Sequence, residues 1–127
     1  MKSIKRIAAG AFAVTAVLTP AAARADTPYA QASALVESDG TVAQGKNITD
    51  AWHPFRGAYC LTVNEKVDLK GDVAVHVTPV GKYDKPRSLS VEVGAATCGE
   101  HRAHTIAVYS QIAYGTEADV AFYLTVS

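Results

Sequence analysis

Residues 57–63 read Gly-Ala-Tyr-Cys-Leu-Thr-Val, and this stretch decides the fold. Its larger side chains, Tyr59, Leu61 and Val63, alternate with the smaller Ala58, Cys60 and Thr62. A period of two is typical of a β-strand that buries one face. The stretch therefore predicts a strand whose bulky side faces a core and whose other side carries a cysteine.

The same alternation recurs on both sides of residues 57–63, with turn residues between the runs. We expect further strands at 34–37, 41–44, 48–52, 73–78, 88–93, 106–112 and 120–126. No segment after residue 25 has the 3.6-residue period of an amphipathic helix. The pattern predicts an all-β domain, a single antiparallel β-sandwich or a small barrel of about eight short strands.

The first residues carry the marks of a cleaved signal peptide with a short helical core. Met1–Arg6 is basic, residues 7–18 are uncharged and apolar or small, and Ala23-Arg24-Ala25 places small residues where signal peptidase requires them. The apolar run is too short for the roughly 20 residues of a spanning helix. We expect a signal peptide at 1–25, a flexible leader at 26–34 and the β-sandwich domain at 35–127, in a protein secreted by a bacterium.

Cleavage after Ala25 would change the charge of the chain. It removes four of the twelve basic residues and none of the twelve acidic ones, so the remaining 102 residues carry a net charge of −4. Phosphate groups and anionic lipids repel such a surface. We therefore expect no nucleic-acid partner and no membrane association once the signal peptide is gone.

The two cysteines, Cys60 and Cys98, both lie after the cleavage point. An even number of cysteines in an exported chain indicates a disulfide. In the chain-entropy model, closing this loop of 38 residues stabilises the fold by about 4 kcal/mol. Two free thiols are the alternative.

Metal or catalytic chemistry has weak support in the sequence. Cys98, His101 and His104 follow one another at a spacing of three, but a strand or loop with that spacing places the histidines on opposite sides. His101 and His104 are thus only a weak metal candidate, and two exposed loop histidines are the alternative. No nucleophile elbow, metal-binding helix or phosphate loop is present. We expect no cofactor and no enzymatic activity.

Two features suggest contact with another molecule. Residues 52–57, Trp-His-Pro-Phe-Arg-Gly, group Trp52 and Phe55 with Arg56, which is suited to stack on an aromatic ring. The outward side of the predicted strands is rich in Thr, Ser, Ala and Tyr, including Tyr109 and Tyr123, and carries little charge. This side is either covered by the second sheet of the sandwich or free to bind a partner or a second copy.

Four segments carry a resemblance to a known type of domain. They are Val36–Gly45, Gly57–Val63, Val73–Pro79 and Ala118–Val126. From Leu35 onward the chain resembles a small β domain of exported actinobacterial proteins of unassigned function, similar to C-terminal domains of some phage-tail or collagen-like bacterial proteins. The resemblance implies a β fold and no catalytic residues. The chain ends in Thr125-Val126-Ser127, where that pattern closes on a cysteine, so the pairing of Cys60 with Cys98 rests on parity.

Together these observations predict a secreted, non-catalytic binding or structural module. Its partner would be a protein, a component of the cell envelope or a second copy of the chain. The alternative is a small inhibitor of an extracellular hydrolase, a protease or an amylase, with residues 81–87 or 52–57 as its reactive edge.

Overall fold

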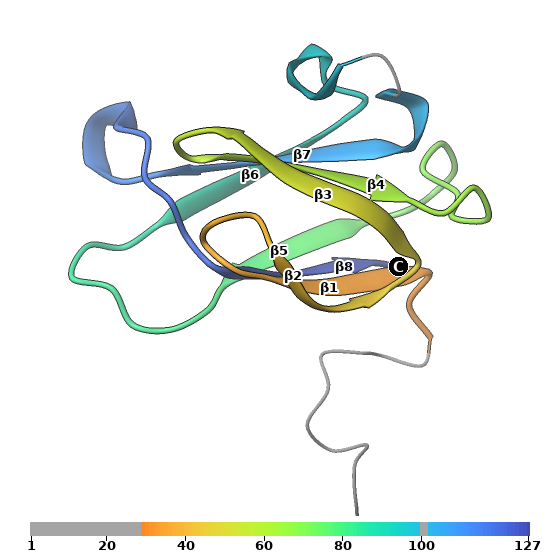
Figure 1. Cartoon of the computed structure of the whole chain (residues 1–127), viewed down its shortest axis with the longest axis horizontal. Helices are drawn as coiled ribbons and strands as arrows, with labels where there is room; N and C mark the ends of the chain where they lie inside the picture. The colour runs from red at the N-terminus through yellow and green to blue at the C-terminus, as the bar shows by residue number, and fades with distance from the viewer. Residues whose placement is uncertain (1–28, 100–101) are drawn as a thin grey trace, which may run out of the picture.

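A computed structural model describes residues 29–99 and 102–127 of the chain. They form two four-stranded antiparallel sheets packed face to face (Figure 1), which confirms the predicted all-β sandwich. The first sheet has the order β2-β1-β8-β5 and the second has the order β3-β4-β7-β6. The strands are β1 Ala32–Val36, β2 Val42–Lys46, β3 Ile48–Phe55, β4 Ala58–Val63, β5 Val75–Pro79, β6 Ser88–Val93, β7 Thr105–Gln111 and β8 Phe122–Val126.

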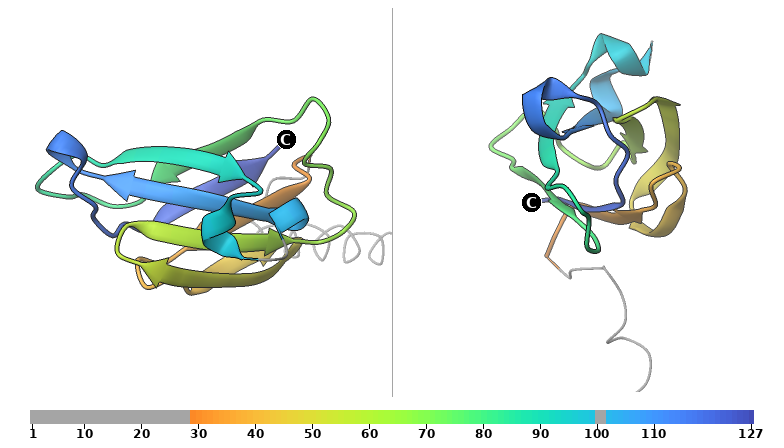
Figure 2. Two further views of the ribbon diagram at one scale, coloured as in Figure 1. Left: turned by 90° about the horizontal axis from the view of Figure 1, so that it is seen from above. Right: turned by 90° about the vertical axis from the view of Figure 1, so that its left-hand side faces the viewer.

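The connections between successive strands alternate between the two ends of the sandwich, so the loops form two groups. The connections β1–β2, β3–β4, β5–β6 and β7–β8 meet at one end of the sandwich, on the left in Figure 1 and in the left view of Figure 2. We call this the loop end, and it comprises residues 37–41, 56–57, 80–87 and 112–121. The start of β1 and the C-terminal Ser127 lie at the other end, which we call the terminal end.

The core lies between the two sheets. Tyr59, Leu61 and Val63 on β4 face Phe122, Leu124 and Val126 on β8, and all six side chains are buried. Each set has the two-residue period that the sequence predicts. A central strand of each sheet therefore buries the large side chains that define the alternation.

A second, smaller cluster lies on the outer side of the second sheet. Cys60 and Cys98 form a disulfide with a Cα–Cα distance of 5.7 Å, as predicted. The short helical turn η2 (Ala96–Cys98) lies over this face in Figure 1, and Cys60 and Ala107 beneath it are fully buried. The disulfide-linked segment therefore covers the small residues Cys60 and Ala107 on this face, an arrangement that differs from both alternatives considered from the sequence.

The first strand begins at Ala32, three residues before the boundary predicted at Leu35. Ala32, Ser33 and Ala34 pair with β8, Ser33 and Ala34 also pair with β2, and all three are buried. Their small size fits a strand at the centre of a sheet, although it weakens the alternating pattern. The domain therefore includes the last residues of the predicted leader, while the predicted signal peptide at 1–25 lies outside the described residues.

No helix among the described residues is long and apolar enough to cross a membrane.

Candidate functional site

The loop end is braced by the carboxylate of Asp119, in the chain leading into β8. Its Oδ1 accepts a hydrogen bond of 2.7 Å from the backbone N–H of Gly57, at the tip of the β3–β4 hairpin. The same oxygen lies 3.0 Å from Nε2 of His53. One side chain thus ties the connection before β8 to the tip of a hairpin in the opposite sheet.

Gly57 is required by this arrangement. Its φ is +75°, and a Cβ at this position would lie 2.7 Å from the carbonyl oxygen of Ser110 and 3.1 Å from the amide nitrogen of Ala118. Only glycine combines a left-handed backbone with so close an approach. The hairpin tip therefore packs directly against the base of the β7–β8 connection.

His53 joins the same network from β3. Its Nδ1 lies 2.7 Å from the carbonyl oxygen of Ala58, and its ring stacks on that of Tyr59 with a centroid distance of 4.4 Å. Both ring nitrogens therefore lie within hydrogen-bonding distance of an oxygen atom. Because both nitrogens are engaged, the geometry gives His53 a bracing role.

The hydroxyl group of Tyr59 connects the two sheets at the loop end. It donates a hydrogen bond of 2.7 Å to the carbonyl oxygen of Ser38 and accepts one of 3.0 Å from the backbone N–H of Val120. Burial raises the pKa of this phenol to about 12. Tyr59 thus fixes the β1–β2 turn and the start of β8 to the centre of the core.

The pKa of Asp119 lies below its ordinary value. Partial burial alone would raise it, but the hydrogen bond from Gly57 and the neighbouring His53 side chain outweigh that effect. A carboxyl group whose pKa is depressed by folding stabilises the fold above its unfolded-state pKa of about 4, and that contribution is lost as the pH falls through its lower folded-state pKa.

We therefore expect Asp119→Asn to reduce stability most between about pH 5 and pH 7, and progressively less as the pH falls below about 4. Urea unfolding of both proteins across this pH range measures the difference. Asp84→Asn removes the same charge from an exposed residue in the β5–β6 loop and is the matched control, expected to change stability by less than about 0.5 kcal/mol. An effect of Asp119→Asn that does not diminish as the pH falls below about 4 would contradict the proposed brace.

Tyr83 and Arg87 hold the β5–β6 loop against the chain that leads into β8. The guanidinium of Arg87 lies 4.5 Å from the centre of the Tyr83 ring, and its Nε donates to the carbonyl oxygen of Asp119 at 3.2 Å. The hydroxyl of Tyr83 accepts a hydrogen bond from the backbone N–H of Ala121. The stacked cation of the loop end is therefore Arg87, and not Arg56 as the sequence suggested.

The β7–β8 connection begins with a tight turn that has Tyr114 at its tip. The N–H of Thr116 bonds to the carbonyl oxygen of Ala113, and Tyr114 and Gly115 have φ values of +62° and +77°. Two successive left-handed residues define a type I′ turn, whose first central position favours Asn, Asp or Gly. Tyr114 is fully exposed and so makes no packing contribution that would offset this strained conformation.

We expect Tyr114→Asn to raise the free energy of unfolding by about 1 kcal/mol, because asparagine adopts the left-handed conformation more readily. For a domain of this size the melting temperature should rise by about 4–8 °C. Tyr114→Phe keeps the strain and is the control, for which no change is expected. An asparagine variant no more stable than the wild type would show that the turn is unstrained.

Exposed aromatic side chains gather at the loop end. Of the five large hydrophobic residues that are exposed in the described part of the chain, Phe55, Tyr114 and Tyr123 lie at or next to this end. Phe55, at the tip of the β3–β4 hairpin, is 48% exposed. Charge is nearly balanced here, with four basic and five acidic residues in the four loops. Recognition at this end would therefore depend mainly on the aromatic rings.

The structure separates the residues that the sequence grouped as interaction candidates. Trp52 and Tyr109 are partly buried against the disulfide cluster, Phe55 and Arg56 lie at the exposed hairpin tip, and Tyr123 is on the outer face of the first sheet. Sequence reasoning missed Tyr114. The signal was Tyr-Gly, separated by two residues from the end of a strand, where Asn-Gly is the usual hairpin turn.

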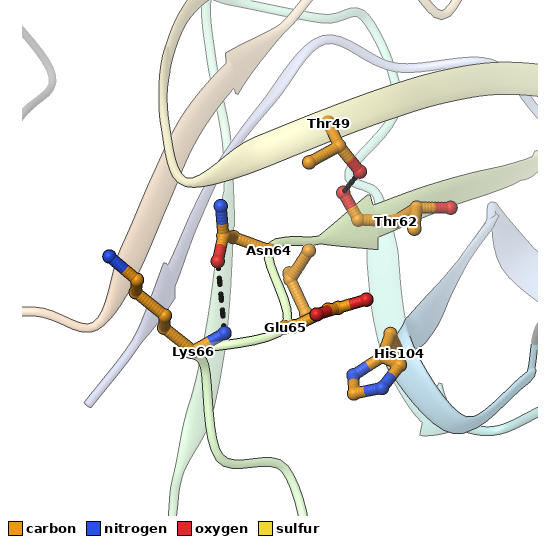
Figure 3. A pocket seen from close by; sticks show the side chains of 7 residues that line it. Thr49, Thr62, Asn64, Glu65, Lys66 and His104 are labelled. Carbon is orange, nitrogen blue, oxygen red and sulfur yellow. Dashed lines mark hydrogen bonds between the residues drawn. The ribbon is translucent and has the colours of Figure 1, made fainter.

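An open groove of about 590 Å³ lies at the terminal end (Figure 3). Its sides are formed by Thr49, Thr62, Val63, Asn64, Glu65, Lys66 and His104. Thr49 donates to the carbonyl oxygen of Thr62, and Asn64 accepts from the N–H of Lys66. His104 is exposed, His101 lies outside the described residues, and the described residues contain no cluster of three or more potential metal ligands.

Comparison with protein-family models, with curated proteins and with solved structures finds no match to this chain.

Proposed function

We propose that the protein is an exported, non-catalytic binding module that contacts a partner protein through its loop end. The observation that carries this proposal is Tyr114, a fully exposed aromatic residue in a backbone conformation that disfavours it. Strained residues of this kind concentrate at functional sites. Tyrosine is also among the residues that contribute most to protein interfaces.

Rigidity of the loop end supports the same role. Asp119, His53, Tyr59 and Arg87 hold the loops by hydrogen bonds and ring contacts that leave Tyr114 and Phe55 exposed. A surface ordered before binding loses less conformational entropy when a partner docks. The braces thus fit a surface that presents two aromatic residues on loops whose backbones are held in place.

The shape of the surface favours a protein over a glycan. The type I′ turn is convex and projects beyond the second sheet in the left view of Figure 2. A projecting ring needs a concave recipient, whereas glycans and other small ligands generally bind in concave sites of the protein that recognises them. The disulfide of Cys60 and Cys98 is suited to an oxidising compartment outside the cytoplasm, which supports an extracellular partner.

To test the proposal, the partner is isolated from the extracellular fraction with the immobilised protein, identified and purified, and its affinity for variants is measured by calorimetry. We expect Tyr114→Ala to weaken binding at least thirtyfold, corresponding to about 2 kcal/mol. Lys66→Ala, at the terminal end, is the control and should bind as the wild type does. If Tyr114→Ala and Phe55→Ala both bind like the wild type, the loop end is not the contact surface.

A second candidate function is inhibition of an extracellular hydrolase, which the projecting Tyr114 turn favours because it could enter an active-site cleft. Tyr114 and Gly57 have left-handed backbones, unlike the extended chain that a protease holds as substrate. An inhibitor of this shape would therefore block the cleft without being cleaved. Steady-state assays of purified amylases and proteases with the wild type and Tyr114→Ala distinguish this function from simple attachment.

A further inference from the structure

The sandwich has four edge strands, and one of them lacks the features that usually prevent edge pairing. Natural edge strands are protected by proline, bulges or charged side chains, lysine above all. In the described structure β5 ends in Pro79, β3 contains Pro54 and two irregularities in register, and β2 carries Lys46 and a bulged pairing with β1. β6 reads Ser-Leu-Ser-Val-Glu-Val, with no proline, lysine or bulge, and pairs regularly with β7. Its one charged side chain, Glu92, accepts a hydrogen bond from the hydroxyl of Tyr109 on β7.

The free hydrogen-bonding groups of β6 can be assigned from its pairing with β7. The N–H of Gly94 bonds to the carbonyl oxygen of Thr105, so Glu92, Ser90 and Ser88 also direct their backbone groups toward β7. The backbone groups of Leu89, Val91 and Val93 then face away from β7. No strand pairs with them within residues 29–99 and 102–127.

An apolar side chain is exposed on the same strand. Val93 is 43% exposed, whereas Leu89 and Val91 on the same face are partly buried against the core. A strand added beside β6 with an apolar residue opposite Val93 would cover this side chain. Cross-strand pairs of this kind stabilise sheets.

The sequence of β6 is complementary to itself in one antiparallel register. When Val91 lies opposite Val91 of a second copy, Leu89 lies opposite Val93 of that copy, and Glu92 lies opposite Ser90. Leu89, Val91 and Val93, whose backbone groups face away from β7, then all lie in hydrogen-bonded pairs with the second copy. A register with the two-fold axis at Glu92 places the two Glu92 side chains opposite each other. A register with the axis at Ser90 leaves Val93 without a partner residue in the strand of the second copy.

We propose that two copies of this protein associate through β6, with a two-fold axis at Val91, to form one continuous eight-stranded sheet. The free edge is six residues long, about 20 Å. The area it can bury is below the roughly 800 Å² per partner of a standard interface, so the dimer is weak and depends on concentration.

The antiparallel arrangement directs the two loop ends in opposite directions, because β6 begins at the loop end and finishes near the terminal end. If the loop end binds a partner as proposed above, the dimer is bivalent and can bridge two partner molecules. That consequence rests on the proposed function, whereas the dimer itself does not. Multivalent attachment can raise the apparent affinity by about 10² to 10⁴.

Sedimentation equilibrium of the purified protein from about 10 µM to about 1 mM tests the dimer, in the range where weak interfaces associate. Val91→Pro removes the N–H that faces the free edge but none that bonds to β7, and Val93→Lys places a charge on the edge. We expect both to weaken association at least tenfold. Val91→Thr keeps the N–H and the branched shape and should associate like the wild type.

A wild type that remains monomeric at the highest concentration would overturn the proposal. Association of Val91→Pro and Val93→Lys equal to that of the wild type would also overturn it, because another surface would then be responsible. If Val91→Pro fails to fold, Val93→Lys provides the test, since the Val93 side chain is 43% exposed and does not belong to the core cluster. Tyr114→Ala should dimerise normally, so failure of the dimer and failure of the loop-end proposal are separate results.

Discussion

Replacing Cys60 and Cys98 together with alanine is expected to lower the free energy of unfolding by about 4 kcal/mol. The disulfide closes a loop of 38 residues, and its removal restores that freedom to the unfolded chain. It also frees the turn at Ala96–Cys98, which covers the outer face of the second sheet. The loss is a large part of the 5–15 kcal/mol that stabilises a typical domain.

Urea unfolding of the wild type, of the double variant and of the wild type in reducing agent measures this contribution. The double variant and the reduced protein should agree, because both remove the covalent link. A stability loss below about 1 kcal/mol would mean that the segment over the second sheet is held by packing alone.

Replacing Tyr59 with phenylalanine is expected to cost about 2–4 kcal/mol, although the ring keeps its place in the core. The hydroxyl bonds to the carbonyl oxygen of Ser38 and to the N–H of Val120, and removing it leaves both backbone groups without that partner. Each such group costs about 1–3 kcal/mol when it is buried. Tyr83→Phe, which removes one hydrogen bond from a partly exposed ring, is the control and should cost less.

Alkaline pH gives an independent test of Tyr59. Folding raises its pKa from an ordinary 10 to about 12, so the neutral form is favoured in the folded protein. The resulting stabilisation is complete below pH 10 and is lost as the pH rises from 10 toward 12. We expect this loss in the wild type and not in Tyr59→Phe, as measured by unfolding at stepwise higher pH. Equal alkaline sensitivity of the two proteins would contradict the assignment.

The alternating pattern predicted most strands well because the outer side of each sheet is open or thinly covered. Most strands therefore carry large side chains on the side that faces the core and smaller or polar ones on the other side. β1 was the exception. Ala32, Ser33 and Ala34 lie at the centre of the first sheet, where small residues pack closely and no alternation of size develops. Its membership in the sheet depends on pairing with β8, about 90 residues away in the chain, which local patterns do not report.

The candidate site was harder to predict because exposure depends on what covers each face. Trp52 and Tyr109 look like free aromatic residues in the sequence, but the disulfide brings residues 95–98 over their strands and partly buries both rings. Tyr114 was overlooked because a loop tyrosine is unremarkable until its backbone is known to be left-handed. Asp119 and Gly57 are 62 residues apart in the chain. They meet because the fold places the β3–β4 hairpin of one sheet against the connection that leads into β8 of the other.

The most direct test of the proposed binding surface is to place a photoreactive amino acid at position 114, and in a second protein at position 66, and to irradiate each with the purified partner. Tyr114 is at the loop end and Lys66 is at the terminal end. We predict a covalent adduct from position 114, suppressed by excess wild-type protein, and none from position 66. An adduct from position 66 alone, or equal adducts from both positions, would contradict the assignment of the loop end as the surface through which this protein binds.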